Sequence, residues 1–101
     1  MNDFIIENFE PFVLDETIED VEDGYYYDDN NRIVRLCIGD KNSDVVFNVI
    51  VYNISDYGQY SFDIDSVDNT DMQDSVLIKN ENIWSKIDEL IYDEVVFDET
   101  H

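Results

Sequence analysis

The sequence predicts a small α+β fold, in which an antiparallel sheet, a three-stranded meander with or without a fourth strand, packs against a C-terminal helix. Three runs in the middle of the chain are rich in β-branched and aromatic residues and are separated by turn-forming clusters. The C-terminal part instead carries apolar residues at helical spacing. With 101 residues, the chain has the length of a single domain, so we expect one acidic domain over residues 1–101.

The three runs cover residues 32–38, 45–54 and 60–67 and predict a three-stranded meander. The second run is apolar on both faces, as expected of a central strand. The third alternates in period two, which predicts that one set points inward and the other toward solvent. The inward set is Tyr60, Phe62 and Ile64, and the outward set is Ser61, Asp63 and Asp65.

Near the C-terminus, the apolar spacing predicts a helix over about residues 81–93 that covers one face of the sheet. Asn80 or Asn82 is available as its N-cap. Its expected buried stripe is Ile83, Ile87, Leu90 and Ile91, and the acidic side chains expected outside are Glu81, Asp88, Glu89 and Asp93. The closing residues 95–97, Val-Val-Phe, are a candidate for an added edge strand.

The N-terminal third is less regular. Pro11 restricts the residue before it to extended geometry, so residues 1–14 are expected as two short pieces rather than one helix. Residues 15–23 form either one or two helical turns, with Asp15 as N-cap, or a solvated loop. The three tyrosines at 25–27 form either a short strand or, since tyrosine is common at interfaces, an aromatic contact surface among acidic residues.

The charge balance is the extreme property of this chain. It has 26 Asp and Glu against five Lys and Arg, for a net charge of −21. Direct binding to nucleic acid or an anionic membrane is therefore excluded as a main activity, because both require basic residues. No export signal or apolar stretch of membrane-spanning length is visible, so a soluble cytoplasmic protein is expected.

The sequence contains few residues suited to catalysis, so we expect neither an enzyme nor a cofactor. The one histidine is the terminal His101, and the one cysteine, Cys37, lies inside a predicted strand, where a thiol usually packs in the core. No phosphate loop or zinc-ligand set is present. The acidic residues 63–74 fail the calcium-loop pattern, because Asp68 stands where that loop requires glycine, so we expect a solvated acidic loop and no metal site.

The magnitude of the charge suggests a function. Twenty-one phosphate charges correspond to roughly 36 Å of duplex DNA, and a domain of this size is about 33 Å across. Charge and size thus resemble those of DNA-mimic proteins, such as phage-encoded anti-CRISPR, anti-restriction and uracil-glycosylase-inhibitor proteins, which do not form one sequence family. A halophilic origin also produces a large negative charge, but it favours an even acidic coat, whereas here aspartates are clustered.

The resemblance implies a phage-encoded inhibitor that blocks the Lys/Arg-lined groove of a CRISPR effector, a restriction enzyme or another nuclease. Two alternatives remain open: an immunity protein against a cationic toxin nuclease, and an acidic adaptor or assembly protein. The residues expected to bind the partner are Asp15, Glu16, Glu19, Asp20, Glu22, Asp23, Tyr26, Tyr27, Asp28, Asp29, Asp63, Asp65, Asp68, Asp71 and Asp74.

Overall fold

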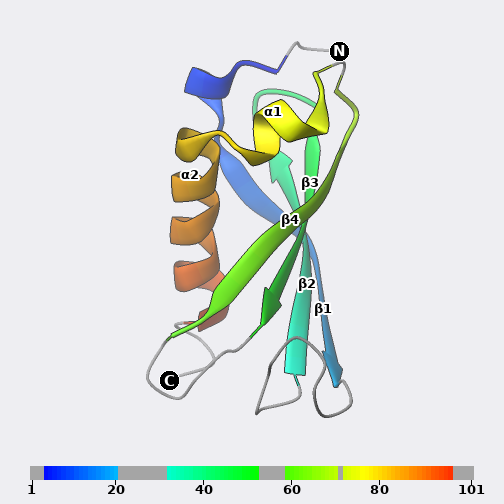
Figure 1. The fold of residues 1–101 in the computed structure, drawn as a ribbon, viewed down its shortest axis with the longest axis vertical. Helices are drawn as coiled ribbons and strands as arrows, with labels where there is room; N and C mark the ends of the chain where they lie inside the picture. Colours follow the sequence, from blue (N-terminus) through cyan, green and yellow to red (C-terminus); the bar gives the residue numbers. More distant parts are fainter. Residues whose placement is uncertain (1–3, 21–31, 53–58, 71, 97–101) are drawn as a thin grey trace.

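The structure is a computed structural model that describes residues 4–20, 32–52, 59–70 and 72–96. Its centre is a four-stranded antiparallel sheet in the order β1-β2-β3-β4. The strands are β1 (Pro11–Asp20), β2 (Arg32–Asp40), β3 (Val46–Tyr52) and β4 (Ser61–Asp68). The helices α1 (Asp74–Ile78) and α2 (Glu81–Ile91) follow β4, and α2 runs beside the sheet (Figure 1). The predicted α+β fold with its meander and C-terminal helix is confirmed.

The fourth strand is β1, in a place where the sequence predicted helical turns or a loop. Asp15 pairs with Cys37 and Asp20 with Arg32, so both predictions for this segment, helical turns and a loop, are wrong over residues 15–20, and Asp15 is not an N-cap. Residues 21–23 lie outside the described residues. The ladder to β2 runs the length of β1, and this long-range pairing overrides a weak local preference. Pro11 is tolerated because it begins an edge strand, where its missing N–H removes no ladder bond.

Helix α2 forms as predicted and buries one stripe against the sheet. Ile83, Ile87 and Ile91 are fully buried, whereas Leu90 is half-buried at the margin of the core. Asn80 is the N-cap, and its side-chain oxygen accepts a hydrogen bond from the Ile83 N–H at 3.1 Å. The stripe packs on Val34, Leu36, Ile38, Phe47, Val49, Val51 and Ile64 of the sheet.

The predicted edge strand at residues 95–97 is wrong for the two valines. Helical hydrogen bonding continues past Ile91 into η3 (Tyr92–Val96), a π-helical turn. Val95 and Val96 therefore belong to the helix, and Phe97 lies outside the described residues. Both edges of the sheet are formed by β1 and β4.

Strand β4 follows the predicted alternation up to a bulge. Phe62 and Ile64 point to the core, and Asp63 and Asp65 are exposed, as predicted. Asn48 of β3 then pairs with Ser66 and Val49 with Ile64, so that Asp65 is an extra residue in β4. The bulge shifts the alternation by one residue, which is why Val67 is buried in the core.

Two short elements complete the α2 side of the sheet. The 3-10 helix η1 (Ile6–Asn8) and α1 lie at the same end of the molecule (Figure 1). Each contributes to the core that α2 covers, since Leu77 of α1 is fully buried there and Ile6 of η1 packs against it. Both are too short to give a periodic sequence signal. None of the described helices has the length and apolar character needed to cross a membrane.

The turn after β2 is organised by a buried carboxylate. Asp40 is 4% exposed, and its Oδ1 accepts hydrogen bonds from the backbone N–H groups of Glu10 at 3.0 Å and Asn42 at 3.2 Å. Its Oδ2 accepts from the Ser43 hydroxyl at 2.7 Å. Asp40 therefore fixes the β2–β3 turn to the start of β1, a structural role that the sequence analysis missed.

Candidate partner-binding surface

Among the described residues, η1, α1 and α2 all pack on one face of the sheet, and none of them covers the other face. These helical elements contribute to the same core on that side of the sheet. The residues that alternate with the core residues form the opposite side, here called the open face. In Figure 1, α2 stands on one side of the twisted strands and no described helix stands on the other. Ile33 and Ile50, which the register also places on this side, are nevertheless buried, at 0% and 4% exposed, so the positions of the open face that a partner can reach lie mainly on the two edge strands.

Carboxylates line the open face along its two edge strands. On β1, Asp15 pairs with Cys37 and Glu19 with Ile33, which places both on the open face. On β4, Asp63 pairs with Ile50, and the exposed Asp65 and Asp68 follow it along the strand. The two rows are three strand spacings apart, or about 14 Å. The acidic rows named below are these: the β1 row of Asp15 and Glu19, and the β4 row of Asp63, Asp65 and Asp68.

Donors on β3 orient the β4 row. The Tyr52 hydroxyl donates to Asp63 Oδ2 at 3.0 Å, and Asn48 Nδ2 donates to Asp68 Oδ2 at 2.9 Å. Asn48 is itself held by its neighbours, since Nδ2 also donates to Ser66 Oγ at 2.9 Å and its Oδ1 accepts from Cys37 Sγ at 3.6 Å. These bonds restrict the carboxylate rotamers before any partner arrives, which lowers the entropic cost of binding.

One ion pair crosses from β2 to the β1 row. Arg35 Nε lies 3.2 Å from Glu19 Oε2, and the two side chains are 44% and 43% exposed. At that exposure such a pair contributes little to stability. Among strand residues with described side chains, Arg35 is the only basic one, so the charge of the open face remains strongly negative.

An apolar patch lies beside the β1 row. Leu14 is the extra residue of a bulge in β1, because Val13 pairs with Ile38 and Asp15 with Cys37. A Cβ on Gly39 would meet Leu14 Cδ1 at 2.9 Å and the Phe12 ring at 3.0 Å, so both side chains lie over this glycine. Leu14 is 52% exposed, which is high for a leucine in a strand.

The structure divides the acidic residues that the sequence analysis grouped together. Glu16 pairs with Leu36 and so belongs to the α2 side of the sheet, not to the open face. Asp74 lies in the first turn of α1, where its Oδ2 accepts a weak hydrogen bond from the Val67 N–H at 3.4 Å. The Asp20 side chain and all of Glu22, Asp23, Tyr26, Tyr27, Asp28, Asp29 and Asp71 lie outside the described residues.

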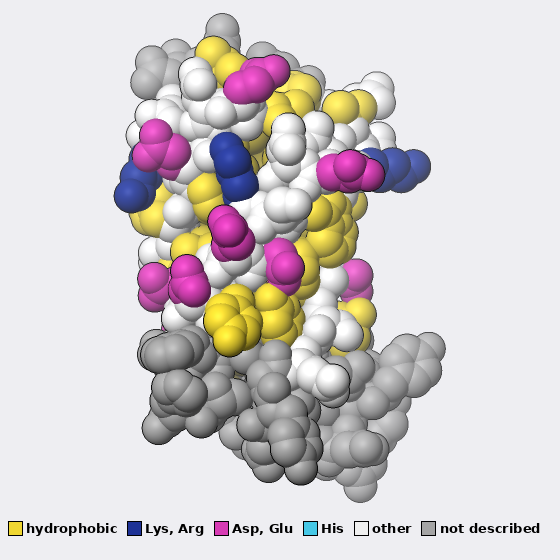
Figure 2. All heavy atoms as spheres, turned by 90° about the vertical axis from the view of Figure 1, so that its left-hand side faces the viewer, with side chains coloured by type: hydrophobic (Ala, Val, Ile, Leu, Met, Phe, Trp, Pro, Cys, Tyr) yellow, Lys and Arg dark blue, Asp and Glu magenta, His cyan; other side chains and the backbone are white. Residues whose placement is uncertain are grey.

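The α2 side carries acidic residues too, but they are mixed with other groups. Figure 2 shows Asp and Glu side chains there, interleaved with hydrophobic side chains and with Lys or Arg side chains. Lys86 on α2 is half-buried, and its Nζ donates to the Phe9 carbonyl oxygen at 2.8 Å. The field on this side is therefore partly cancelled by fixed positive charge.

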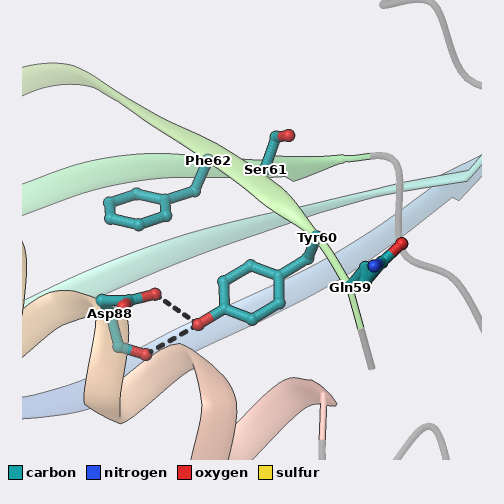
Figure 3. Close-up of a pocket in the computed structure, with 5 residues that line it drawn as sticks. All are labelled: Gln59, Tyr60, Ser61, Phe62 and Asp88. Carbon is teal, nitrogen blue, oxygen red and sulfur yellow. Dashed lines mark hydrogen bonds between the residues drawn. The ribbon is translucent and has the colours of Figure 1, made fainter. Parts of the chain in front are cut away.

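A hollow on the α2 side lies where β4 begins, and it is lined by Gln59, Tyr60, Ser61, Phe62 and Asp88 (Figure 3). The Tyr60 hydroxyl donates to the Asp88 carboxylate and also to its backbone oxygen at 3.1 Å. Partial burial, followed by the hydrogen bond and charge of Asp88, raises the pKa of Tyr60 well above its usual range. The phenol therefore keeps its proton further into the alkaline range than an ordinary tyrosine does, and the contact joins the start of β4 to α2.

The described residues offer no built site for a metal ion, because no three His, Cys, Asp or Glu side chains among them are grouped closely enough to hold one.

The open face also contains four residues that the sequence analysis did not expect there: Leu14, Asn48, Arg35 and Tyr52. A leucine inside an acidic segment was the one available signal for Leu14. The chain matches no protein-family model, and neither a curated protein nor a solved structure is significantly similar to it.

Proposed function

We propose that this protein is an acidic nucleic-acid mimic that inhibits a cationic nucleic-acid-binding enzyme. The target classes that fit best are a CRISPR effector and a restriction enzyme, with a phage as the expected source of the inhibitor. One observation carries the proposal: a chain of 101 residues holds a net charge of −21 and presents exposed carboxylates along both edge strands of its sheet. Ordinary small domains keep their net charge to roughly 2–8.

The mechanism follows from electrostatics. A negative field of this size accelerates encounter with a Lys/Arg-lined channel and weakens encounter with nucleic acid itself. Once seated, the carboxylates of Asp63 and Asp68 take the place of phosphates against the basic side chains of the channel. Both are already oriented by donors from β3. Nucleic acid and the inhibitor then compete for the same positive charges.

Inhibition of a purified enzyme tests this function. A guide-loaded CRISPR effector and a restriction endonuclease are each assayed for DNA cleavage over a range of substrate and inhibitor concentrations. We expect competitive inhibition that weakens as the salt concentration rises from about 50 to about 200 mM, because binding that depends on charge contacts loses affinity over that range. Inhibition that excess DNA does not relieve contradicts mimicry.

A matched control separates the folded surface from bulk charge. The same assay is run with poly-glutamate at equal total charge, which is acidic but has no fixed carboxylate positions. Because orientation of Asp63 and Asp68 lowers the cost of binding, the protein is expected to inhibit at much lower concentration than the polymer. Equal potency of the two would mean that any polyanion suffices.

A further inference from the structure

We propose that the partner docks on the open face and that the part of the partner seated there is a cationic channel built for double-stranded nucleic acid. The inference rests on the proposed function and adds which face binds and which form of nucleic acid is imitated. It depends on three features of the described residues: the sign of the charge on each side, the separation of the acidic rows and the apolar patch.

The sign of the charge selects the face. On the α2 side, Lys79 follows α1 and Lys86 lies on α2, and Figure 2 shows Lys or Arg side chains among the acidic ones there. On the open face, the basic side chain of Arg35 is within 3.2 Å of Glu19, and the β4 row has no described basic neighbour on its own strand. A cationic channel therefore finds a more uniform negative surface on the open face than on the α2 side.

The separation of the two acidic rows indicates a duplex. They stand on β1 and β4, the outer strands of the sheet, at about 14 Å. The major groove of B-DNA, bounded by its two phosphate backbones, is about 12 Å wide. A channel that grips both backbones thus meets one carboxylate row with each set of its basic residues. A channel for a single strand needs only one such row.

The apolar patch indicates that the occupant is a protein surface rather than free cations. Leu14 is 52% exposed and lies with Phe12 over Gly39, next to Asp15 of the β1 row. Protein interfaces combine an apolar centre with a polar rim, and the centre gives much of the binding energy. Small cations or polyamines gain nothing from a leucine, whereas the wall of a protein channel does.

Two triple variants with equal charge test the choice of face. The first neutralises the β4 row (Asp63→Asn, Asp65→Asn, Asp68→Asn), and the second neutralises exposed acids of the α2 side (Glu81→Gln, Glu89→Gln, Glu94→Gln). Each changes the net charge from −21 to −18, because three negative charges are removed. The asparagine oxygen can still accept the bonds from Tyr52 and Asn48, so the fold is retained, as thermal melting verifies.

A second pair of variants tests the apolar patch. Leu14→Ala removes a 52% exposed side chain from the open face, and Val76→Ala removes a 51% exposed side chain from α1. Neither change creates a buried cavity, so stability is nearly unchanged in both. We expect Leu14→Ala to raise the dissociation rate of the complex about tenfold and Val76→Ala to leave it unchanged. Equal dissociation rates for the two variants would remove Leu14 from the interface.

The binding panel consists of three purified proteins: a guide-loaded CRISPR effector, a restriction endonuclease and a single-strand-binding protein with OB folds. We expect binding to one or both of the first two and none to the third, with the β4-row variant weakened at least about tenfold and the α2 variant within about threefold. If both triple variants weakened binding equally, the assignment of the interface to the open face would be wrong, while the proposed function would stand. Binding to the single-strand-binding protein alone would overturn the duplex inference. Binding to none of the three would instead contradict the proposed function for these target classes.

Discussion

The Tyr60 hydroxyl donates a hydrogen bond to the carboxylate of Asp88 and thereby fastens the residue before β4 to the outer side of α2 (Figure 3). The two residues are 28 positions apart in the sequence, so the bond closes the fold where the sheet and the helix would otherwise separate. It also explains why Asp88, which was expected simply outside the helix stripe, is not an indifferent surface residue.

This bond predicts a defined alkaline response. The pKa of Tyr60 is raised in the folded state, so its contribution to stability is complete below the ordinary tyrosine pKa, near 10, and is lost as the pH rises through the folded value. We expect Tyr60→Phe to cost less than about 1 kcal/mol at pH 7, because the bond is largely exposed, and to flatten the loss of stability above pH 10. Urea unfolding at several pH values measures both. Identical slopes for the variant and the parent protein would contradict the assignment.

The buried stripe of α2 predicts unequal costs along one helix. Ile87 is 0% exposed, so Ile87→Ala is expected to cost about 2–5 kcal/mol through lost burial and a residual cavity. Leu90→Ala should cost clearly less, since Leu90 is only half-buried. The exposed Glu89 is the control, and Glu89→Ala should stay within about 0.5 kcal/mol of the parent protein. Chemical denaturation ranks the three, and equal costs would be inconsistent with this packing of α2.

The carboxylate under the β2–β3 turn predicts a loss that surface acids do not share. Asp40→Ala leaves the N–H groups of Glu10 and Asn42 and the hydroxyl of Ser43 without their acceptor, at an expected cost of about 2–3 kcal/mol. Asp44 is exposed on the same turn, and Asp44→Ala is expected to change the melting temperature little. Differential scanning calorimetry compares the two. A melting temperature equally insensitive to both changes would show that Asp40 does not hold the turn.

The crowding of negative charge predicts that salt stabilises the protein. Most of the 26 acidic residues have no basic partner available, because the chain has only five Lys and Arg. At 0.15 M salt, screening acts over a Debye length of about 8 Å and relieves repulsion within each acidic row. We expect the melting temperature to rise between about 10 mM and 150 mM sodium chloride. A melting temperature that does not change would mean that the carboxylates are too dispersed to act as one surface.

The sequence predicted the elements whose signals are local. The alternation in residues 60–65 and the spacing of Ile83, Ile87 and Ile91 are visible in any short window, and both were confirmed. Strand β1 was not predicted, because its residues after Pro11 are rich in acids and join the sheet only through pairing with β2. Long-range pairing leaves no signal in the segment itself.

The sequence predicted that the partner-binding surface is acidic, but it did not predict which face of the sheet carries the acidic residues. The excess of acids was evident, yet which of them share a face depends on the bulges at Leu14 and Asp65, each of which shifts the alternation by one residue. Asp63, Asp65 and Asp68 are exposed together on β4, whereas Glu16 falls on the other side of the sheet. The supporting donors, Tyr52 and Asn48, come from a strand that was expected only to be apolar.

The most direct test of competitive mimicry asks whether the inhibitor and nucleic acid can occupy the target together. A guide-loaded CRISPR effector is mixed with a fluorescently labelled target duplex and with this protein, and analytical ultracentrifugation at the dye wavelength follows the labelled duplex. If binding is competitive, added protein releases the duplex completely, the apparent dissociation constant of the duplex rises in proportion to inhibitor concentration, and no ternary species sediments. A ternary complex in which the duplex and this protein both bind with unchanged affinity would contradict competitive mimicry.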